Sequence, residues 1–353
     1  MTTHSIAVIA GDGIGKEVIP AGIAALEAAE RGSNVAFSFT ELPWSCDYYA
    51  KHGRMIDDGG FEQLATFDAI YLGALGAPGV PDSASAGLIL KIRQRFDQYV
   101  NLRPMRLLPG LSSPLAGRGA QDIDMVCVRE NSEGEYSGVG GRVHVGTPNE
   151  VAQQVGVFTR RGIERIIRYA FELAATRPRC ALASATKSNA LTHSMTLWDE
   201  VGESVRKDFP RVDYRKYHVD ALAARMITHP QTLDVLVTSN LFGDILTDIG
   251  SAISGSLGIA PGANINPART FPSMFEPIHG SAPDIAGKGI ANPIGAIWAG
   301  ALMADHLGHR AVHDRILSAI ERVVANGKLR TPDLGGNATT REMSDAILRE
   351  INA

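Results

Sequence analysis

Short apolar runs alternate with stretches of helical periodicity along most of the chain. Five of these runs are predicted to be buried strands, namely residues 5–10, 67–76, 122–128, 181–186 and 234–239. After the first run, Ile19, Ile23 and Leu26 recur at helical spacing. The segment Ile163–Ala174 repeats its apolar residues in the same way and predicts an amphipathic helix with Thr159 as its N-cap. The alternation predicts an α/β fold, and a chain of 353 residues suits two domains.

Two glycine-rich segments depart from this alternation. In residues 137–157, glycines alternate with valines, which predicts a twisted hairpin or arm outside the helix-covered sheet. Residues 255–295 are rich in glycine and proline and are too long for a passive turn. We therefore expect this second segment to bind a ligand.

Composition and charge narrow the classes of protein. The net charge of −4 lacks the basic excess of nucleic-acid-binding proteins. The cysteines Cys46, Cys127 and Cys180 are odd in number and widely spaced, which predicts neither a disulfide framework nor a CxxC metal site. No apolar stretch is as long as a transmembrane helix, and the first residues lack the pattern of a signal peptide. We expect a cytoplasmic protein with neither nucleic acid nor membrane as partner.

Polar residues of chemical interest come directly after predicted strands. They are residues 11–15, Arg129, Lys187 and residues 240–248. In open α/β sheets, ligands bind beyond the carboxyl ends of the strands. These segments are therefore expected to converge on one cleft.

Three carboxylates are candidates for a metal site. Asp244 and Asp248 lie four residues apart at the start of a predicted helix, so both project from one face. Such a pair is stabilised by a cation, and oxygen ligands suit Mg²⁺ or Mn²⁺. A solvated helix face is the alternative, but Ile245 and Leu246 make the segment largely apolar. Asp220, after another strand-like run, is a candidate third ligand.

Arginine, tyrosine and lysine side chains provide a second group of candidates. Arg93, Arg103 and Arg129 are expected to bind the carboxylates of a small acid through paired hydrogen bonds, although most arginines are merely surface charges. Tyr136 and Lys187 form a possible acid–base pair, because a lysine can lower the pKa of a nearby tyrosine or act as a base when desolvated. A half-buried tyrosine and an exposed lysine are the alternative.

A candidate cofactor loop occupies residues 276–293. His279 and Asn292 could hold an adenine and its ribose, and Asp284 could accept both ribose hydroxyls while repelling a 2′-phosphate. This arrangement favours NAD over NADP, whereas a structural Ω-type loop is the alternative. Residues 11–15 read GDGIG, which lacks the G-x-G-x-x-G spacing of a Rossmann fingerprint. We therefore do not expect a Rossmann fold, although these glycines permit a close backbone approach.

Six segments, taken together and in order, resemble the β-hydroxyacid oxidative decarboxylases, the family of isopropylmalate and isocitrate dehydrogenases. They are GDGIG (11–15), NLRP (101–104), RENSEGEYSG (129–138), TKSNAL (186–191), NLFGDILTD (240–248) and EPIHGSAPDIAGKGIANP (276–293). The resemblance implies an isopropylmalate dehydrogenase-like α/β fold in which two domains share one twisted mixed sheet. The discontinuous first domain would comprise residues 1–100 and 252–353 with the cofactor loop. The second, residues 101–251, would carry the catalytic residues and a dimerisation arm.

The resemblance also implies roles for individual residues. The substrate carboxylates would be bound by Arg93, Arg103 and Arg129. Tyr136 would be the general acid, Lys187 the general base, and Asp220 the acidic neighbour of that base. The metal ligands for Mg²⁺ or Mn²⁺ would be Asp220, Asp244 and Asp248. NAD would be held by His279, Gly280, Ser281, Ala282, Asp284 and Asn292. Lys187 and Asp220 would reach the site from the partner subunit of a homodimer, and K⁺ is a further candidate cation.

Within this family, five stretches resemble the tartrate/D-malate dehydrogenase branch. They are LPWSCDYYAKHGRM (42–55), SEGEYSG (132–138), GGRVHVGTP (140–148), IAPGANINP (259–267) and FPSMFEP (271–277). The segment PDSASAGLIL (81–90) departs from the branch, because it is one residue short and lacks a histidine and a tryptophan. We expect this segment to be a loop that senses the substituent at C3 of the substrate.

The expected activity is NAD-dependent oxidative decarboxylation of a malate-type 2-hydroxy diacid. D-Malate, giving pyruvate, CO₂ and NADH, and tartrate are the first candidate substrates. The alternatives are 3-isopropylmalate dehydrogenase of leucine biosynthesis, a non-catalytic metabolite-binding regulatory subunit, and a Rossmann 2-hydroxyacid dehydrogenase that needs no metal.

Overall fold

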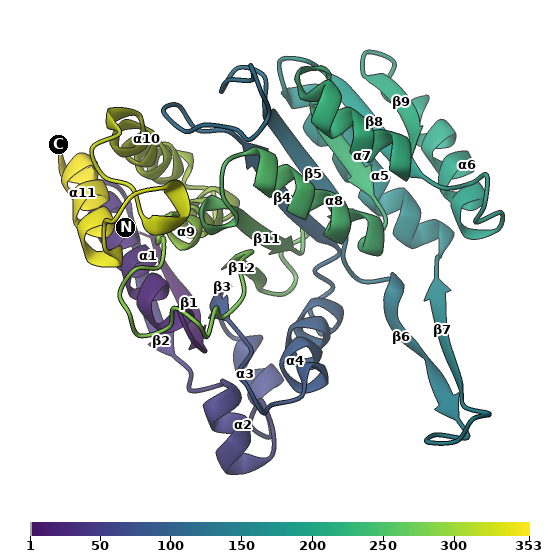
Figure 1. The fold of residues 1–353 in the computed structure, drawn as a ribbon, viewed down its shortest axis with the longest axis horizontal. Coiled ribbons are helices and arrows are strands. Elements are labelled where there is room, and N and C mark those ends of the chain that lie inside the picture. Colours follow the sequence, from purple (N-terminus) through teal and green to yellow (C-terminus); the bar gives the residue numbers. More distant parts are fainter. Residues whose placement is uncertain (1) are drawn as a thin grey trace.

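The computed structural model describes residues 2–353 and contains one large mixed sheet (Figure 1). In spatial order its strands are β2 (Val35–Glu41), β1 (Thr2–Gly11), β3 (Ala69–Ala74), β12 (Ser273–Pro277), β11 (Pro261–Ile265), β4 (Val100–Arg106), β5 (Asp124–Glu130), β10 (Val235–Thr238), β8 (Ala181–Thr186) and β9 (Asp213–His218). The pairs β12–β11, β11–β4 and β4–β5 are antiparallel, and the remaining pairs are parallel. The predicted mixed α/β sheet is confirmed, and the five predicted strands are β1, β3, β5, β8 and β10.

Helices cover the sheet. They are α1 (Gly15–Ala29), α2 (Cys46–His52), α3 (Gly60–Leu64), α4 (Asp82–Arg95), α5 (Arg160–Thr176), α6 (Ser194–Arg206), α7 (Val219–Thr228), α8 (Asn240–Ile253), α9 (Ile294–His306), α10 (Arg310–Asn326) and α11 (Thr340–Asn352). The three that the sequence predicts are α1, α5 and α8. Short 3₁₀ turns lie at Pro230–Thr232, Leu257–Ile259 and Pro332–Leu334. Helices α1, α9, α10 and α11 pack together at one end of the molecule, and α5 packs on α6 at the other (Figure 1). Among residues 2–353, no helix is both long and apolar enough to cross a membrane.

Helix α5 illustrates how local sequence determines an element. The Thr159 hydroxyl accepts a hydrogen bond from the Gly162 amide at 2.9 Å, which satisfies one of the free donors at the helix start. The buried side chains Ile163, Ile166 and Ala170 recur every three or four residues and face the sheet. The N-cap and the apolar face are both as predicted.

The strands divide the sheet between chain segments. The first five in spatial order belong to residues 2–74 and 261–277, and the other five belong to residues 100–238. The two sets meet where β11 pairs with β4. The division into two domains stays a prediction, with residues 1–100 and 252–353 in the first and residues 101–251 in the second. The strand order agrees with it.

A hairpin projects from the body as predicted. Strands β6 (Gly134–Val143) and β7 (Val151–Val157) form a separate two-stranded sheet that extends away from the large one (Figure 1). Five of its valines are exposed by 46–65%, namely Val139, Val143, Val145, Val151 and Val155.

The structure corrects two predicted loops. Residues 81–90 are not a loop, because α4 begins at Asp82 directly after Pro81. Alanine and leucine favour helix there, and proline is well tolerated at a helix start. Residues 255–295 are not one long ligand loop either, because β11 and β12 take up its middle as buried strands. The loop that remains is residues 278–293, between β12 and α9.

Candidate active site

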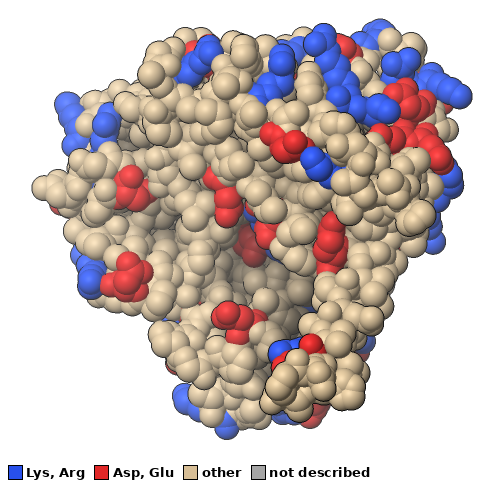
Figure 2. Space-filling view, turned by 45° about the vertical axis from the view of Figure 1, so that its right-hand side comes forward, with Lys and Arg blue, Asp and Glu red and all other residues tan. Residues whose placement is uncertain are grey.

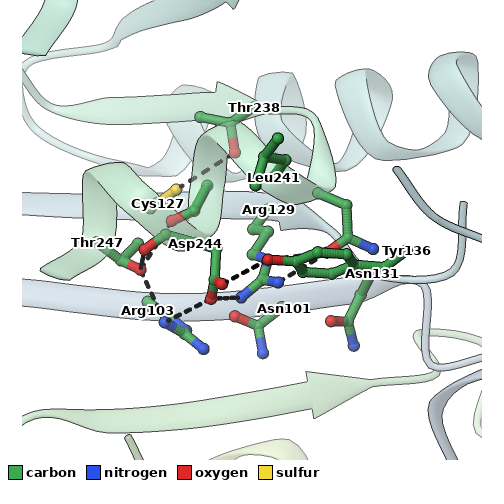
Figure 3. Close-up of polar contacts among 12 residues, drawn as sticks. Asn101, Arg103, Cys127, Arg129, Asn131, Tyr136, Thr238, Leu241, Asp244 and Thr247 are labelled. Carbon is green, nitrogen blue, oxygen red and sulfur yellow. Dashed lines mark hydrogen bonds and ion pairs between the residues drawn. The ribbon is translucent and has the colours of Figure 1, made fainter. Parts of the chain in front are cut away.

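The predicted substrate arginine Arg129 lies at the centre of a polar cluster beside α8 (Figure 3). Its guanidinium donates to Asp244 at 2.6 Å, and its Nε and Nη2 donate to the Asn240 side chain at 3.1 and 2.7 Å. The side chain is almost fully buried because α8 packs closely on β5. A Cβ atom at Gly243 would lie 2.5 Å from Arg129, so this glycine permits the close approach.

Tyr136 reaches the same carboxylate from the base of the arm. Its hydroxyl donates to the second oxygen of Asp244 at 2.8 Å. Burial raises the pKa of Tyr136, and the hydrogen bond to Asp244 raises it further, so the hydroxyl holds its proton at neutral pH. Partial burial raises the pKa of Asp244, but Arg129 and Tyr136 outweigh this effect and lower it overall. The structure therefore joins a proton donor, a carboxylate and a guanidinium.

The other two predicted arginines lie near this cluster. Arg103 on β4 donates to Thr247 at 2.8 Å and lies 3.9 Å from Asp244. Arg93 on α4 pairs with Glu276 at 3.1 Å. Both arginines are buried, and the Nε atom of each has no hydrogen-bond partner among residues 2–353. Buried donors without partners are costly, and a bound carboxylate would satisfy them.

The electrostatics of the three arginines favour an anionic ligand. Burial lowers the pKa of Arg129 to about 9, with further lowering by the charges of Arg103 and Arg93. Burial also lowers the pKa of Arg103, again assisted by Arg93. The three guanidiniums destabilise one another's charged forms, and an anion bound among them would relieve this repulsion.

Lys187 and Asp220 form a second group within the chain. Lys187 follows β8, Asp220 lies in the first turn of α7, and their side chains meet at 2.6 Å. The hydrogen bond from Lys187 lowers the pKa of Asp220. Within one chain, Lys187 thus pairs with Asp220, and Tyr136 pairs with Asp244. Tyr136 and Lys187 form no hydrogen bond with each other in residues 2–353.

The three predicted metal ligands do not meet within one chain. Asp248 is exposed one turn beyond Asp244, and Asp220 lies with Lys187. Among residues 2–353 there is no cluster of three ligand side chains. The residue pattern alone allowed a metal site formed by Asp220, Asp244 and Asp248 of the same chain. Residues 2–353 do not form such a site. A site completed by Asp220 of a second subunit, which the resemblance implies, stays a prediction.

The predicted cofactor loop borders a pocket of about 320 Å³. Its lining includes His279, Ala282 and Asn292, together with apolar side chains such as Ile14 and Leu257. Burial lowers the pKa of His279, and its buried Nε2 has no partner among the described residues. A neutral ring with a free nitrogen beside apolar walls could recognise a planar heterocycle such as adenine.

The other residues predicted to bind cofactor lie around this pocket in different ways. Gly280 and Asp284 are exposed, whereas Ser281 is buried. The Ser281 carbonyl accepts from the Ile14 amide at 2.9 Å, and a Cβ at Gly13 would lie 1.9 Å from that oxygen. The glycine-rich turn after β1 therefore packs against the cofactor loop. The two backbones can approach this closely because Gly13 has no side chain.

Several polar residues of the site were given no individual role from the sequence. Asn240 anchors Arg129, Glu276 pairs with Arg93, and Asn264 donates to Glu276 at 2.7 Å. The sequence offered one signal for Asn240 and Glu276, which is that each lies inside one of the quoted family motifs. Their burial depends on packing and is not visible in the residue pattern.

The site suits a small acid bound beside a larger cofactor, because it combines a buried arginine trio and an Asp–Tyr pair with a separate pocket. The chain belongs to the isocitrate/isopropylmalate dehydrogenase family, which it matches over residues 5–347. It is thus an enzyme of the decarboxylating dehydrogenase class, and the predicted membership is confirmed.

Individual relatives support the same grouping. The chain is 57% identical to the D-malate dehydrogenase [decarboxylating] of Escherichia coli (strain K12), over 99% of each chain. It is 52% identical to the tartrate dehydrogenase/decarboxylase of Pseudomonas putida, over 98% of each. The crystal structure of isocitrate dehydrogenase from Methylococcus capsulatus superposes with a TM-score of 0.89 at 35% identity, covering 99% of this chain and 100% of that one.

Proposed function

We propose that this protein catalyses the NAD-dependent oxidative decarboxylation of a malate-type 2-hydroxy diacid, with D-malate and tartrate as its substrates. The observation that carries the proposal is the buried cluster of Arg93, Arg103 and Arg129 beside the Asp244–Tyr136 pair. The relatives named D-malate and tartrate dehydrogenase support the choice of substrate. In this reaction the substrate would lose a hydride from C2 and then its β-carboxylate.

The three arginines would bind the two carboxylates of the substrate. Arg93 and Arg103 each have a free Nε donor, and guanidiniums hold carboxylates through paired hydrogen bonds. Figure 2 shows a hollow near the centre of one face with acidic side chains around it. Because an acidic rim repels a dianion, affinity for the substrate has to come from arginines inside the protein.

Asp244 and Asp248, with Asp220 of a second subunit, would hold Mg²⁺ or Mn²⁺. Carboxylate oxygens are the donors that these ions prefer, and Asp244 already projects among the arginines. Once bound, the ion would polarise the oxygen at C2 and stabilise the charge that develops when CO₂ leaves. Lys187 beside Asp220 would accept the hydroxyl proton. Tyr136 would donate a proton to the carbon that loses CO₂.

NAD is the proposed cofactor, with its adenine in the pocket beside His279. Asp284 is exposed on the loop that borders this pocket, where its carboxylate could accept the ribose hydroxyls and repel a 2′-phosphate. NAD is therefore preferred over NADP. A cytoplasmic location fits the three free cysteines and is likewise a proposal.

The choice among substrates is tested by a panel of D-malate, tartrate and 3-isopropylmalate, each with NAD and NADP. We expect kcat/KM to be highest for D-malate or tartrate with NAD, and EDTA to abolish the activity until Mg²⁺ or Mn²⁺ is restored. Highest kcat/KM for 3-isopropylmalate would show the leucine-biosynthesis enzyme instead. Activity that persists in EDTA would refute the metal-dependent mechanism, and absence of NADH formation with every diacid would support a regulatory subunit.

We further propose a homodimer in which the arm formed by β6 and β7 packs against a second subunit. An isolated two-stranded hairpin is marginally stable in water, and the exposed valines of this arm indicate a covering partner. Val143→Asp with Val155→Asp is expected to raise the dimer dissociation constant by about 10²-fold or more, because two buried charges are costly. Sedimentation velocity measures the change. Wild-type protein that sediments as a monomer would refute the dimer, and an unchanged constant would remove the arm from the interface.

A further inference from the structure

Arg93 differs from the neighbouring arginine of the same helix in how it is held. Its ion pair with Glu276 at 3.1 Å has side chains only 9% and 10% exposed. Arg95 pairs with Glu62 through side chains that are 54% and 64% exposed. Exposed pairs contribute little to geometry or stability, whereas a buried pair requires precise partners. Glu276 therefore has more influence on the position of its arginine than Glu62 has.

Glu276 is itself held by a buried amide. Asn264 on β11 donates to Glu276 on β12 at 2.7 Å. The side-chain oxygen of Asn264 accepts from Asn101 on β4 at 2.8 Å and from Asn131 after β5 at 3.0 Å. The three asparagines are 0–2% exposed. Hydrogen bonds among buried groups reinforce one another and restrict each member to one orientation.

This chain of hydrogen bonds crosses the junction between the two halves of the sheet. Arg93 and Glu276 belong to the half that contains β11, whereas Arg103 and Arg129 belong to β4 and β5. Asn101 is paired in register with Arg129 across β4 and β5, and with Asn264 across β4 and β11. The network thus joins the arginine of one half to the strands that bear the other two.

We propose that Glu276, held by Asn264, is a positioning residue that places the Arg93 guanidinium in register with Arg103 and Arg129. The substrate is a diacid whose carboxylates are a fixed number of bonds apart, so binding requires guanidiniums at a matching separation. The proposal rests on the proposed function and extends it by naming the groups that set this separation. Glu276 acts through Arg93 and does not need to touch the substrate.

The test is a double-mutant cycle of Glu276→Ala and Arg93→Ala, measured with the preferred substrate of the panel. We expect Glu276→Ala to raise KM for the diacid by about 10- to 100-fold, as for loss of a charged hydrogen bond, with a change in kcat of less than about fivefold. KM for NAD is expected to stay within about twofold. In the Arg93→Ala background, Glu276→Ala is expected to have little further effect, because its target is gone.

Companion variants separate positioning from folding. Glu276→Gln keeps an acceptor oxygen for Arg93 and is expected to restore most of the affinity lost in Glu276→Ala. Asn264→Ala is expected to raise KM for the diacid in the same direction and by less. Glu62→Ala, which frees the exposed Arg95 on the same helix, is the matched control and should leave KM unchanged.

Four outcomes would overturn the proposal. They are unchanged KM in Glu276→Ala, additive effects in the double variant, an equal rise in KM for NAD, and no recovery with glutamine. If Glu276→Ala does not fold, Asn264→Ala decides the question, and wild-type KM for the diacid in that variant would refute the positioning role. Wild-type enzyme that oxidises no diacid would instead refute the proposed function.

Discussion

Asp244→Asn is expected to lower kcat/KM by about 10³-fold, roughly 4 kcal/mol of transition-state stabilisation. This carboxylate contacts Arg129 at 2.6 Å and accepts a hydrogen bond from Tyr136 at 2.8 Å. In the proposed reaction it also binds the divalent cation. An asparagine keeps one acceptor oxygen but has no charge for either the guanidinium or the metal. Calorimetric titration with Mn²⁺ should show weakened binding alongside the loss of activity.

The control is Asp213→Asn, which removes an exposed carboxylate that pairs with Arg215 on β9. It should leave both Mn²⁺ affinity and kcat/KM within about twofold of the wild type, as expected for an exposed ion pair. If Asp244→Asn also retains activity within about fivefold and binds Mn²⁺ normally, Asp244 is not a metal ligand and the proposed mechanism is wrong.

Tyr136→Phe is expected to separate the two halves of the reaction. Removal of a positioned proton donor typically lowers the rate of the dependent step by about 10²- to 10⁴-fold, whereas hydride transfer does not need this proton. The raised pKa of Tyr136 keeps its hydroxyl protonated at neutral pH, as a proton donor requires. Phenylalanine preserves the ring, which lies 5.6 Å from the Arg129 guanidinium.

The measurement compares NADH formation with release of CO₂ from the same diacid. We expect NADH formation to fall by less than about tenfold and the 2-oxo diacid to accumulate, since its decarboxylation is slow. Tyr217→Phe is the matched control, because Arg225 lies 5.5 Å from that ring on a different part of the surface. Equal loss of oxidation and decarboxylation in Tyr136→Phe would show that Tyr136 is not the proton donor for the second step.

Much of the fold follows from short-range patterns in the chain. Buried strands such as β3 are continuous apolar runs, and α5 has both an N-cap and an apolar face at helical spacing. These features depend on the few residues that make up each element, so they are visible without the rest of the protein. The two errors have different origins. Residues 81–90 were expected to be a loop from their resemblance to the family but begin a helix, and glycine and proline in β11 mark a central strand.

The candidate site is only partly visible in the residue pattern. Arg129, Tyr136 and Asp244 are recognisable from motifs, and the structure brings these three into contact. Glu276 and Asn264 are not recognisable as a pair, because their partners lie on strands far away in the chain. Nor does the spacing of the aspartates reveal that Asp220 pairs with Lys187 while Asp248 is exposed.

Residue order alone was enough to establish the fold class, half of the strands of the large sheet, the helices α1, α5 and α8, the projecting hairpin and the membership of the family. Each of these depends on local periodicity or on contiguous motifs. The partners of Arg93 and Arg129 were established by the folded chain, because Glu276 on β12 is 183 positions from Arg93 and Asp244 on α8 is 115 positions from Arg129. Contacts of this kind arise when the strands of the mixed sheet are placed side by side, and periodicity within a single element carries no information about that placement.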